Sequence, residues 1–202
     1  MNNFLNEKKT NFKQKIHDYL GKIRDSFNDE IINQINLLSN DLLKVWEEKK
    51  VVYICGNGGS AANAIHIAND LIFGAGACGD GPLIEGLRVE ALSANGAVMT
   101  CIANDISYEE IFSTQIKTKG NDGDLLIVLS GSGNSKNIIN AVKASKSLGV
   151  KSYAILGYDG GICKYEADEA IHFKINDMQI AEDCQLIVGH ICMQFLNSNK
   201  PI

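Results

Sequence analysis

The sequence predicts an α/β fold: a three-layer αβα sandwich with a central parallel sheet, preceded by a pair of N-terminal helices. Short apolar segments with the composition of strands alternate with helical segments along residues 50–202. The segment 124–129, Asp-Leu-Leu-Ile-Val-Leu, is a nearly continuous apolar run, typical of a strand buried on both faces of a parallel sheet. Strands that alternate with helices form right-handed crossovers, so we expect helices on both faces.

Length and composition indicate one domain, 1–202, with a substantial core. A hydrophobic content of 45% excludes a disordered chain. The net charge is −5 and there is no basic stripe, so direct binding to nucleic acid is not expected. No secretory signal and no membrane-spanning run are recognisable. The six cysteines are scattered without a Cys-x-x-Cys pair, which favours a reducing cytoplasm over a disulfide framework.

Residues 1–49 are expected to form two helices. Apolar residues recur at spacings of three and four between Leu20 and Val45, and Asn28 or Asp29 could separate the pair. The pair could pack on its own domain or form an interface between subunits. The length of the apolar stripe favours the interface.

A glycine-rich turn follows the first predicted strand, 51–54. The glycines within Gly56–Gly59 permit a tight turn, and Ser60 is expected to cap the next helix. That helix places His66 and Asp70 on one face, four residues apart. A strand, a glycine turn and a helix N-terminus favour anion binding, but alone they also fit an ordinary connection. The spacing matches neither the dinucleotide-binding fingerprint nor a P-loop.

The remaining elements follow from the same patterns. In order, we expect a loop at 74–86, a strand at 88–92, helices at 94–103 and 108–117 around the polar corner Asn104-Asp105, a helix at 136–148, strands at 151–156 and 170–175, and a final helix at 178–197.

A second polar turn, Ser130-Gly-Ser-Gly-Asn-Ser135, follows the strand 124–129. Its three hydroxyls, its flexible backbone and the following helix N-terminus suit a phosphate group. A serine-capped helix is the simpler interpretation of such a turn. However, two such turns at the carboxyl ends of parallel strands lie at the edge where α/β sheets bind ligands.

These motifs, together with two further segments, resemble the sugar-isomerase (SIS) domain family. The resemblance rests on Cys55–Leu71, Ile102–Asp105, Leu129–Ser135 and Glu182–His190, and it covers nearly the whole chain. Within the family, the chain is most similar to the phosphoheptose isomerase branch. The resemblance implies an aldose–ketose isomerase for a sugar phosphate, with sedoheptulose 7-phosphate as the expected substrate, and a homotetramer with active sites at subunit interfaces.

The resemblance also implies roles for individual residues. The phosphate would be held by Ser130, Gly131, Ser132 and Ser135, and the sugar by Asn57, Gly58, Gly59, Ser60, Asn104 and Asp105. Zinc would be bound by His66, Asp70, Glu182 and His190. Asp70 or Glu182 would act as the base, and His190 as its acid/base partner.

The chain departs from the family's pattern at several of these positions. The family usually has Glu where this chain has Asp70, and Gln where it has Glu182. Asp183 stands in place of a Glu, and Gln185 in place of a common His. A base at Glu182, another sugar phosphate or a loss of catalysis would each fit. From the residues alone, His190 also fits a hydrogen-bonded core histidine. The non-catalytic alternative is an SIS protein that binds the bacterial replication initiator or senses sugar phosphates.

Overall fold

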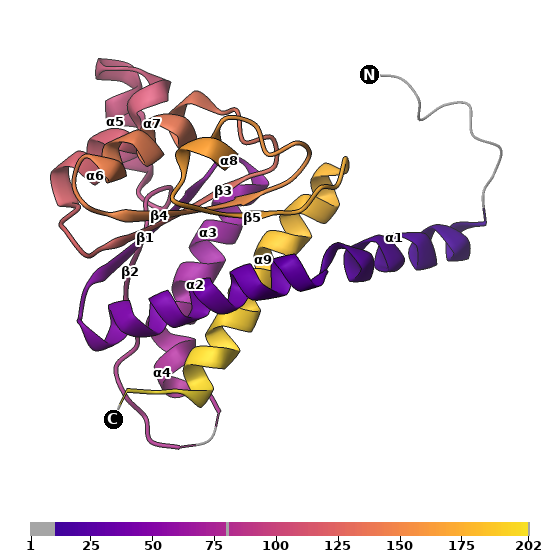
Figure 1. The fold of residues 1–202 in the computed structure, drawn as a ribbon. Coiled ribbons are helices and arrows are strands. Elements are labelled where there is room, and N and C mark those ends of the chain that lie inside the picture. The colour runs from indigo at the N-terminus through magenta and orange to yellow at the C-terminus, as the bar shows by residue number, and fades with distance from the viewer. Residues whose placement is uncertain (1–10, 80, 202) are drawn as a thin grey trace.

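The fold is built on one sheet of five parallel strands (Figure 1). The computed structural model describes residues 11–79 and 81–201. The strands are β1 (Val51–Gly56), β2 (Arg88–Ala91), β3 (Leu125–Ser130), β4 (Lys151–Leu156) and β5 (Glu169–His172), in the order β2-β1-β3-β4-β5. Every neighbouring pair is parallel. This confirms the predicted fold class.

Helices cover both faces of the sheet and complete three layers. One face carries α2 (Asp29–Glu47), α3 (Gly59–Asn69) and α9 (Met178–Ser198); the other carries α5 (Gly96–Asp105), α6 (Ser113–Lys119), α7 (Lys136–Lys146) and α8 (Cys163–Glu166). In β3, Leu125, Ile127 and Leu129 enter the first core, while Leu126 and Val128 enter the second. Both faces are apolar because both are buried, which explains the continuous apolar run in the sequence.

The strand order places a topological switch point between β1 and β3. The two strands are hydrogen-bonded neighbours, with Gly56 paired to Leu129 at their carboxyl ends. The connections that leave them pass to opposite faces of the sheet, and such a divergence opens a crevice at the carboxyl edge. The glycine turn and the serine turn follow β1 and β3 respectively. The fold therefore brings both predicted anion-binding turns to one crevice.

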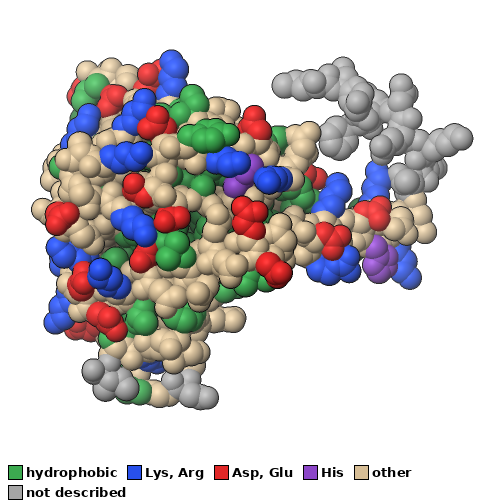
Figure 2. Space-filling model, in the orientation of Figure 1, with side chains coloured by type: hydrophobic (Ala, Val, Ile, Leu, Met, Phe, Trp, Pro, Cys, Tyr) green, Lys and Arg blue, Asp and Glu red, His purple; other side chains and the backbone are tan. Residues whose placement is uncertain are grey.

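The two N-terminal helices have different environments. The predicted break is confirmed: Asn28 caps α2, and its side chain accepts a hydrogen bond from the Ile31 backbone N–H at 3.0 Å. The helix α2 packs against α9, whereas α1 (Phe12–Ser26) has no buried residue and projects from the domain (Figures 1 and 2). The part of the predicted helical region at residues 1–10 lies outside the described residues.

Three predicted elements differ from the structure. The helix expected at 108–117 is a 3₁₀ turn, η2 (Tyr108–Glu110), followed by α6. The strand expected at 170–175 ends at His172, because the Ile175 N–H bonds back to the Phe173 carbonyl and turns the chain. The expected loop 74–86 begins with the short helix α4 (Ala75–Ala77), which continues a π-helical turn, η1 (Asp70–Gly74). Leu71 in η1 and Ala75 in α4 are buried in the core, which holds this continued helical segment against the domain.

All six cysteines are free thiols, four of them buried. Within residues 11–79 and 81–201, no helix has both the length and the apolar character needed to cross a bilayer.

Candidate active site

The glycine turn and the serine turn line one pocket of about 260 Å³ at the switch point. Its lining consists of Asn57, Gly58, Gly59, Ser60, Leu129, Ser130, Gly131, Ser132, Ser135, Met178 and Glu182. Eight of the ten substrate-binding residues expected from the sequence are therefore together. Met178 was not anticipated; it occupies the space beside Gly131, where any side-chain Cβ would meet its sulfur.

The glycine turn places the N-terminus of α3 at this pocket. Gly58 has a φ of 55°, a left-handed conformation that favours glycine, and it is the N-cap residue of α3. Ser60 was expected to be the cap, but it lies buried inside the first turn of the helix. The cap therefore has no side-chain hydrogen bond. Unpaired N–H groups of a helix start favour an anionic group nearby.

The serine turn keeps its hydroxyl hydrogens for a ligand. The Ser130 hydroxyl accepts from the Gly133 N–H at 3.0 Å, and the Ser132 hydroxyl accepts from the Asn134 N–H at 3.3 Å. Since each oxygen is used as an acceptor, each O–H can still donate. Ser135 is the N-cap residue of α7 and forms no side-chain cap bond. Three hydroxyl donors and a helix start thus face the pocket, a combination suited to phosphate.

The segment after β4 forms backbone hydrogen bonds to the serine turn. The Gly157 N–H donates to the Gly131 carbonyl at 2.9 Å, and the Cys163 N–H donates to the Gly133 carbonyl at 3.0 Å. These bonds occupy two carbonyls that would repel an anion. The turn is therefore organised for anion binding before a ligand arrives.

Glu182 brings a carboxylate from α9 into the same pocket. Its oxygens lie where a Cβ of Gly59 would be, so only glycine permits this approach. The described residues provide no hydrogen-bond or ion-pair partner for this carboxylate. A partly enclosed carboxylate without a partner is available to accept a proton.

A second group of side chains lies about two turns further along α3 and α9. The Nε2 atoms of His66 and His190 are 3.1 Å apart, and each lies 3.4 Å from Oδ2 of Asp70. Ligand atoms of a tetrahedral zinc ion with bonds of 2.0–2.1 Å would be about 3.3 Å apart. The spacing of these three atoms therefore fits a zinc ion with one open position. Glu182, expected as a fourth ligand, is not in this group among the described residues.

The π-helical turn η1 begins at Asp70. Single π turns within helices frequently occur at functional sites, because the extra residue shifts the following side chains around the helix. Asp70 has the lowest side-chain exposure of the group, 18%, against 50% for His66 and 42% for His190. The carboxylate is thus the most enclosed member of the group.

Asn104 and Asp105, expected to contact the sugar, do not line the pocket. They lie in the last turn of α5, and the Asn104 amide donates to the Asp105 carboxylate at 2.7 Å. Gln185, at another departure from the family, is buried; its Oε1 accepts from Asn63 at 3.3 Å and its Nε2 has no partner.

Two residues that contact the site were not predicted from the sequence. The amide of Asn137, on α7, bonds to Asn57, as does the hydroxyl of Tyr108. Neither residue belongs to a recognisable motif. No sequence pattern predicts the contact between Asn57 and Asn137, which are 80 residues apart.

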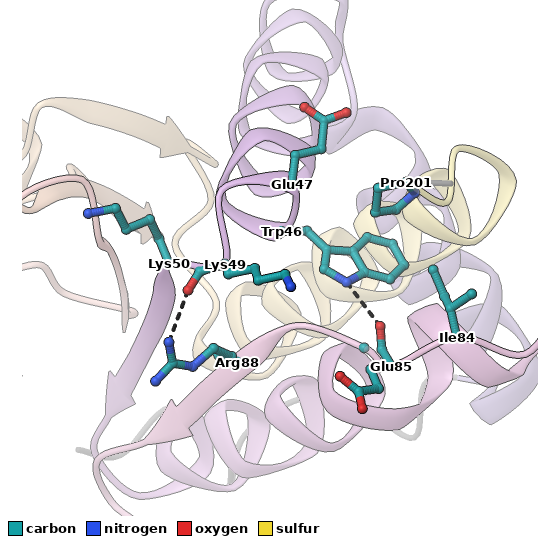
Figure 3. A pocket seen from close by; sticks show the side chains of 9 residues that line it. Trp46, Glu47, Lys49, Lys50, Ile84, Glu85, Arg88 and Pro201 are labelled. Atoms are coloured by element: carbon teal, nitrogen blue, oxygen red, sulfur yellow. Dashed lines mark hydrogen bonds between the residues drawn. The ribbon is translucent and has the colours of Figure 1, made fainter.

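A pocket of about 360 Å³ lies at the opposite edge of the sheet, at the amino ends of β1 and β2 (Figure 3). The indole N–H of Trp46, which lines this pocket, donates to the Glu85 carbonyl at 3.1 Å, and Arg88 donates to the Lys49 carbonyl at 3.0 Å. Cationic and anionic side chains both line it. None of the candidate residues does, and ligands of open α/β sheets bind at the carboxyl edge. We therefore assign the site to the smaller pocket.

Comparison with known proteins agrees with this site. The SIS domain family matches residues 12–157. The phosphoheptose isomerase of Sulfurimonas denitrificans is 37% identical over 164 residues, which are 81% of this chain and 82% of that protein. That of Helicobacter pylori strain P12 is 36% identical over 173 residues, or 85% of each chain.

Solved structures show the same fold. The phosphoheptose isomerase GmhA of Neisseria gonorrhoeae superposes with a TM-score of 0.81 at 24% identity, over 93% of this chain and all of that one. The phosphoheptose isomerase of Francisella tularensis gives 0.82 at 23% identity, over 94% and 100%. By its domain match and by relatives that align over most of its length, the chain belongs to the SIS domain family, in the branch of the phosphoheptose isomerases.

Proposed function

We propose that this protein is an aldose–ketose isomerase that converts sedoheptulose 7-phosphate to D-glycero-D-manno-heptose 7-phosphate. The observation that carries the proposal is the common pocket of the serine turn and Glu182. It joins a phosphate-binding element to a free carboxylate. The names of the relatives support the substrate, and a heptose phosphate would serve synthesis of lipopolysaccharide or capsule precursors. The six free thiols support a cytoplasmic location.

In this proposal, the serine turn binds the substrate's phosphate far from the reacting carbons. Ser130, Ser132 and Ser135 donate hydroxyl hydrogen bonds to its oxygens. The binding energy of this remote group holds the sugar chain in one orientation, which lowers the entropic part of the barrier.

Glu182 acts as the base. It removes the proton from the carbon beside the carbonyl, which yields an enediolate, and returns the proton to the neighbouring carbon. Asp70, the alternative base, is engaged between the two histidines and is less suited to this role. A carboxylate at position 182 therefore replaces the base that the shorter Asp70 no longer provides.

Protons must also move between the two neighbouring oxygens of the substrate. When no metal is bound, we assign this transfer to His190, whose imidazole is kept beside Asp70. One nitrogen cannot both carry a proton and ligate a metal, so the metal content decides between these roles.

His66, Asp70 and His190 are the residues that would hold zinc. When bound, zinc would supply a Lewis acid that polarises the carbonyl oxygen and stabilises negative charge on the enediolate.

We further propose a homotetramer in which α1 packs on another subunit. Phe12 is 74% exposed and Leu20 59%, and the projecting α1 has no buried residue of its own. Light scattering should give four times the chain mass for the wild type. Leu20→Glu should lower that mass, whereas His17→Glu, an equal change at another exposed position of α1, should not.

Turnover tests the proposed reaction. Purified protein is incubated with sedoheptulose 7-phosphate and followed by NMR, as prepared, after chelation and after addition of zinc. We expect conversion to a heptose 7-phosphate that chelation abolishes and zinc restores. Conversion at the same rate with and without metal would support the isomerase activity and contradict a requirement for zinc. Absence of conversion under every metal condition would contradict the proposal and favour another sugar phosphate or a binding role.

A further inference from the structure

A pair of amides joins the two turns of the site. Asn57 Nδ2 donates to Asn137 Oδ1, and Asn137 Nδ2 donates to Asn57 Oδ1, both at 2.9 Å. Asn57 belongs to the glycine turn, while Asn137 lies in the first turn of α7, directly after the serine turn. Asn137 is 2% exposed. A buried, reciprocal amide pair has one geometry, so it sets the spacing of the two turns.

Tyr108 provides the second hydrogen bond to the side-chain oxygen of Asn57. Its hydroxyl donates to Asn57 Oδ1 at 3.0 Å. An amide oxygen accepts two hydrogen bonds and an amide nitrogen donates two. Both sites on Asn57 Oδ1 are therefore occupied, and one Nδ2 hydrogen remains. The side chain of Asn57 can therefore offer a sugar one donor and no acceptor.

Tyr108 is held in place although its ring is 58% exposed. Its neighbour Glu109 forms an ion pair with Lys136 at 2.8 Å, and the Glu109 carbonyl accepts from Asn140 at 3.2 Å. Lys136 and Asn140 both belong to α7. The turn η2 is thus attached to the same helix as Asn137.

We propose that Asn137 and Tyr108 are positioning residues that act through Asn57 to hold the glycine turn in register with the serine turn. The inference rests on the proposed isomerase function. In this proposal the serine turn binds the phosphate, whereas Glu182 contacts Gly59 at the start of α3, next to the glycine turn. Loosening the connection would leave phosphate binding intact but displace the reacting carbons. A displacement of about 1 Å can lower turnover about 100-fold.

Steady-state kinetics with sedoheptulose 7-phosphate and inhibition by inorganic phosphate test this proposal. We expect Asn137→Ala to lower kcat at least about tenfold while the inhibition constant of phosphate changes less than about twofold. Tyr108→Phe, which removes only the hydroxyl, should lower kcat about threefold to tenfold. Asn40→Ala is the matched control, because it removes an exposed helical amide on α2 that bonds only to Asn36 and contacts neither η2 nor Asn57. Its kcat should stay near that of the wild type.

A double-mutant cycle separates positioning from a general structural role. In an Asn57→Ala background, Tyr108→Phe should have no further effect, since its hydroxyl has lost its acceptor. Additive effects would overturn the proposal, as would wild-type kcat in Asn137→Ala or an equal loss of phosphate affinity.

Hydrogen exchange gives a readout that does not require turnover. Backbone amides of residues 57–61 should exchange faster in Asn137→Ala than in the wild type and Asn40→Ala. If the wild type does not isomerise the substrate, the proposed function fails, and the exchange rates alone decide whether the amide pair holds the turn. Unchanged exchange in Asn137→Ala would refute it.

Discussion

The carboxylate of Glu182 lies against Gly59 at the first turn of α3, in the space that any larger residue there would fill. The two residues are 123 positions apart and belong to helices packed on the same face of the sheet. The contact therefore presents a carboxylate to the pocket, the type of group that the proposed proton transfer requires.

Replacement of Glu182 by Gln should remove the base while keeping its size. We expect kcat for sedoheptulose 7-phosphate to fall at least about 100-fold, with a small change in KM, because the phosphate contacts remain. The measurement is steady-state kinetics at saturating substrate.

The adjacent carboxylate provides the control for this substitution. Asp183 accepts a hydrogen bond from Tyr19 of α1 at 2.5 Å and does not line the pocket. Asp183→Asn should leave kcat near the wild-type value. Comparable losses in both variants would show that charge on α9, and not a specific base, matters.

His66→Ala should abolish stoichiometric zinc binding. Three ligands at tetrahedral spacing bind the ion, and two alone bind it far more weakly. Elemental analysis after dialysis against a weak chelator should find about one zinc per wild-type subunit and a small fraction of that in the variant. His17→Ala, on exposed α1, should retain the metal. Equal zinc contents in all three proteins would rule out this site.

Ser132→Ala should mainly weaken substrate binding. A hydroxyl that donates to a phosphate contributes about 1.5–3 kcal/mol, so KM should rise about tenfold or more while kcat changes little. Ser147→Ala is the matched control, since that hydroxyl caps the Ala144 carbonyl at the far end of α7. A large fall in kcat at unchanged KM would place Ser132 at the reacting carbons instead.

The stability of the fold should fall as the pH drops below about 6.5, in part because of His172. Burial lowers the pKa of this imidazole from its ordinary value of 6.5, against an opposing contribution from its hydrogen bond to the Tyr158 carbonyl. Since a carbonyl only accepts, Nε2 carries the proton and the buried Nδ1 has no partner. The unfolded chain therefore takes up a proton that the folded chain resists, and acid favours unfolding.

Urea unfolding at pH 7.5 and 5.5 measures this contribution. In His172→Gln, the difference in unfolding free energy between the two pH values should shrink by about 0.5 kcal/mol or less, because solvent screens the half-buried ring. If the unfolding free energy changed more between pH 7.5 and 5.5 in His172→Gln than in the wild type, the predicted destabilising effect of His172 at low pH would be contradicted.

Much of the site could be predicted because its parts are local. The turns after β1 and β3 follow from glycine and serine at strand ends, and the pair His66 and Asp70 follows from helical spacing. The role of Ser60 was predicted wrongly, because the positive φ of Gly58 lets the helix begin earlier. The position of Asn104 away from the pocket depends on how α5 packs, which no local pattern encodes.

The sequence by itself determined most of the strands, the order of the elements and the two polar turns, since hydrophobic periodicity and backbone freedom act over a few residues. Only the tertiary structure decided that Glu182 lies in the pocket with the serine turn and not beside His66, Asp70 and His190. It also decided that Asn137 and Tyr108 hold Asn57. These choices depend on the axial register of α3, α7 and α9, which is set by side-chain packing across the sheet.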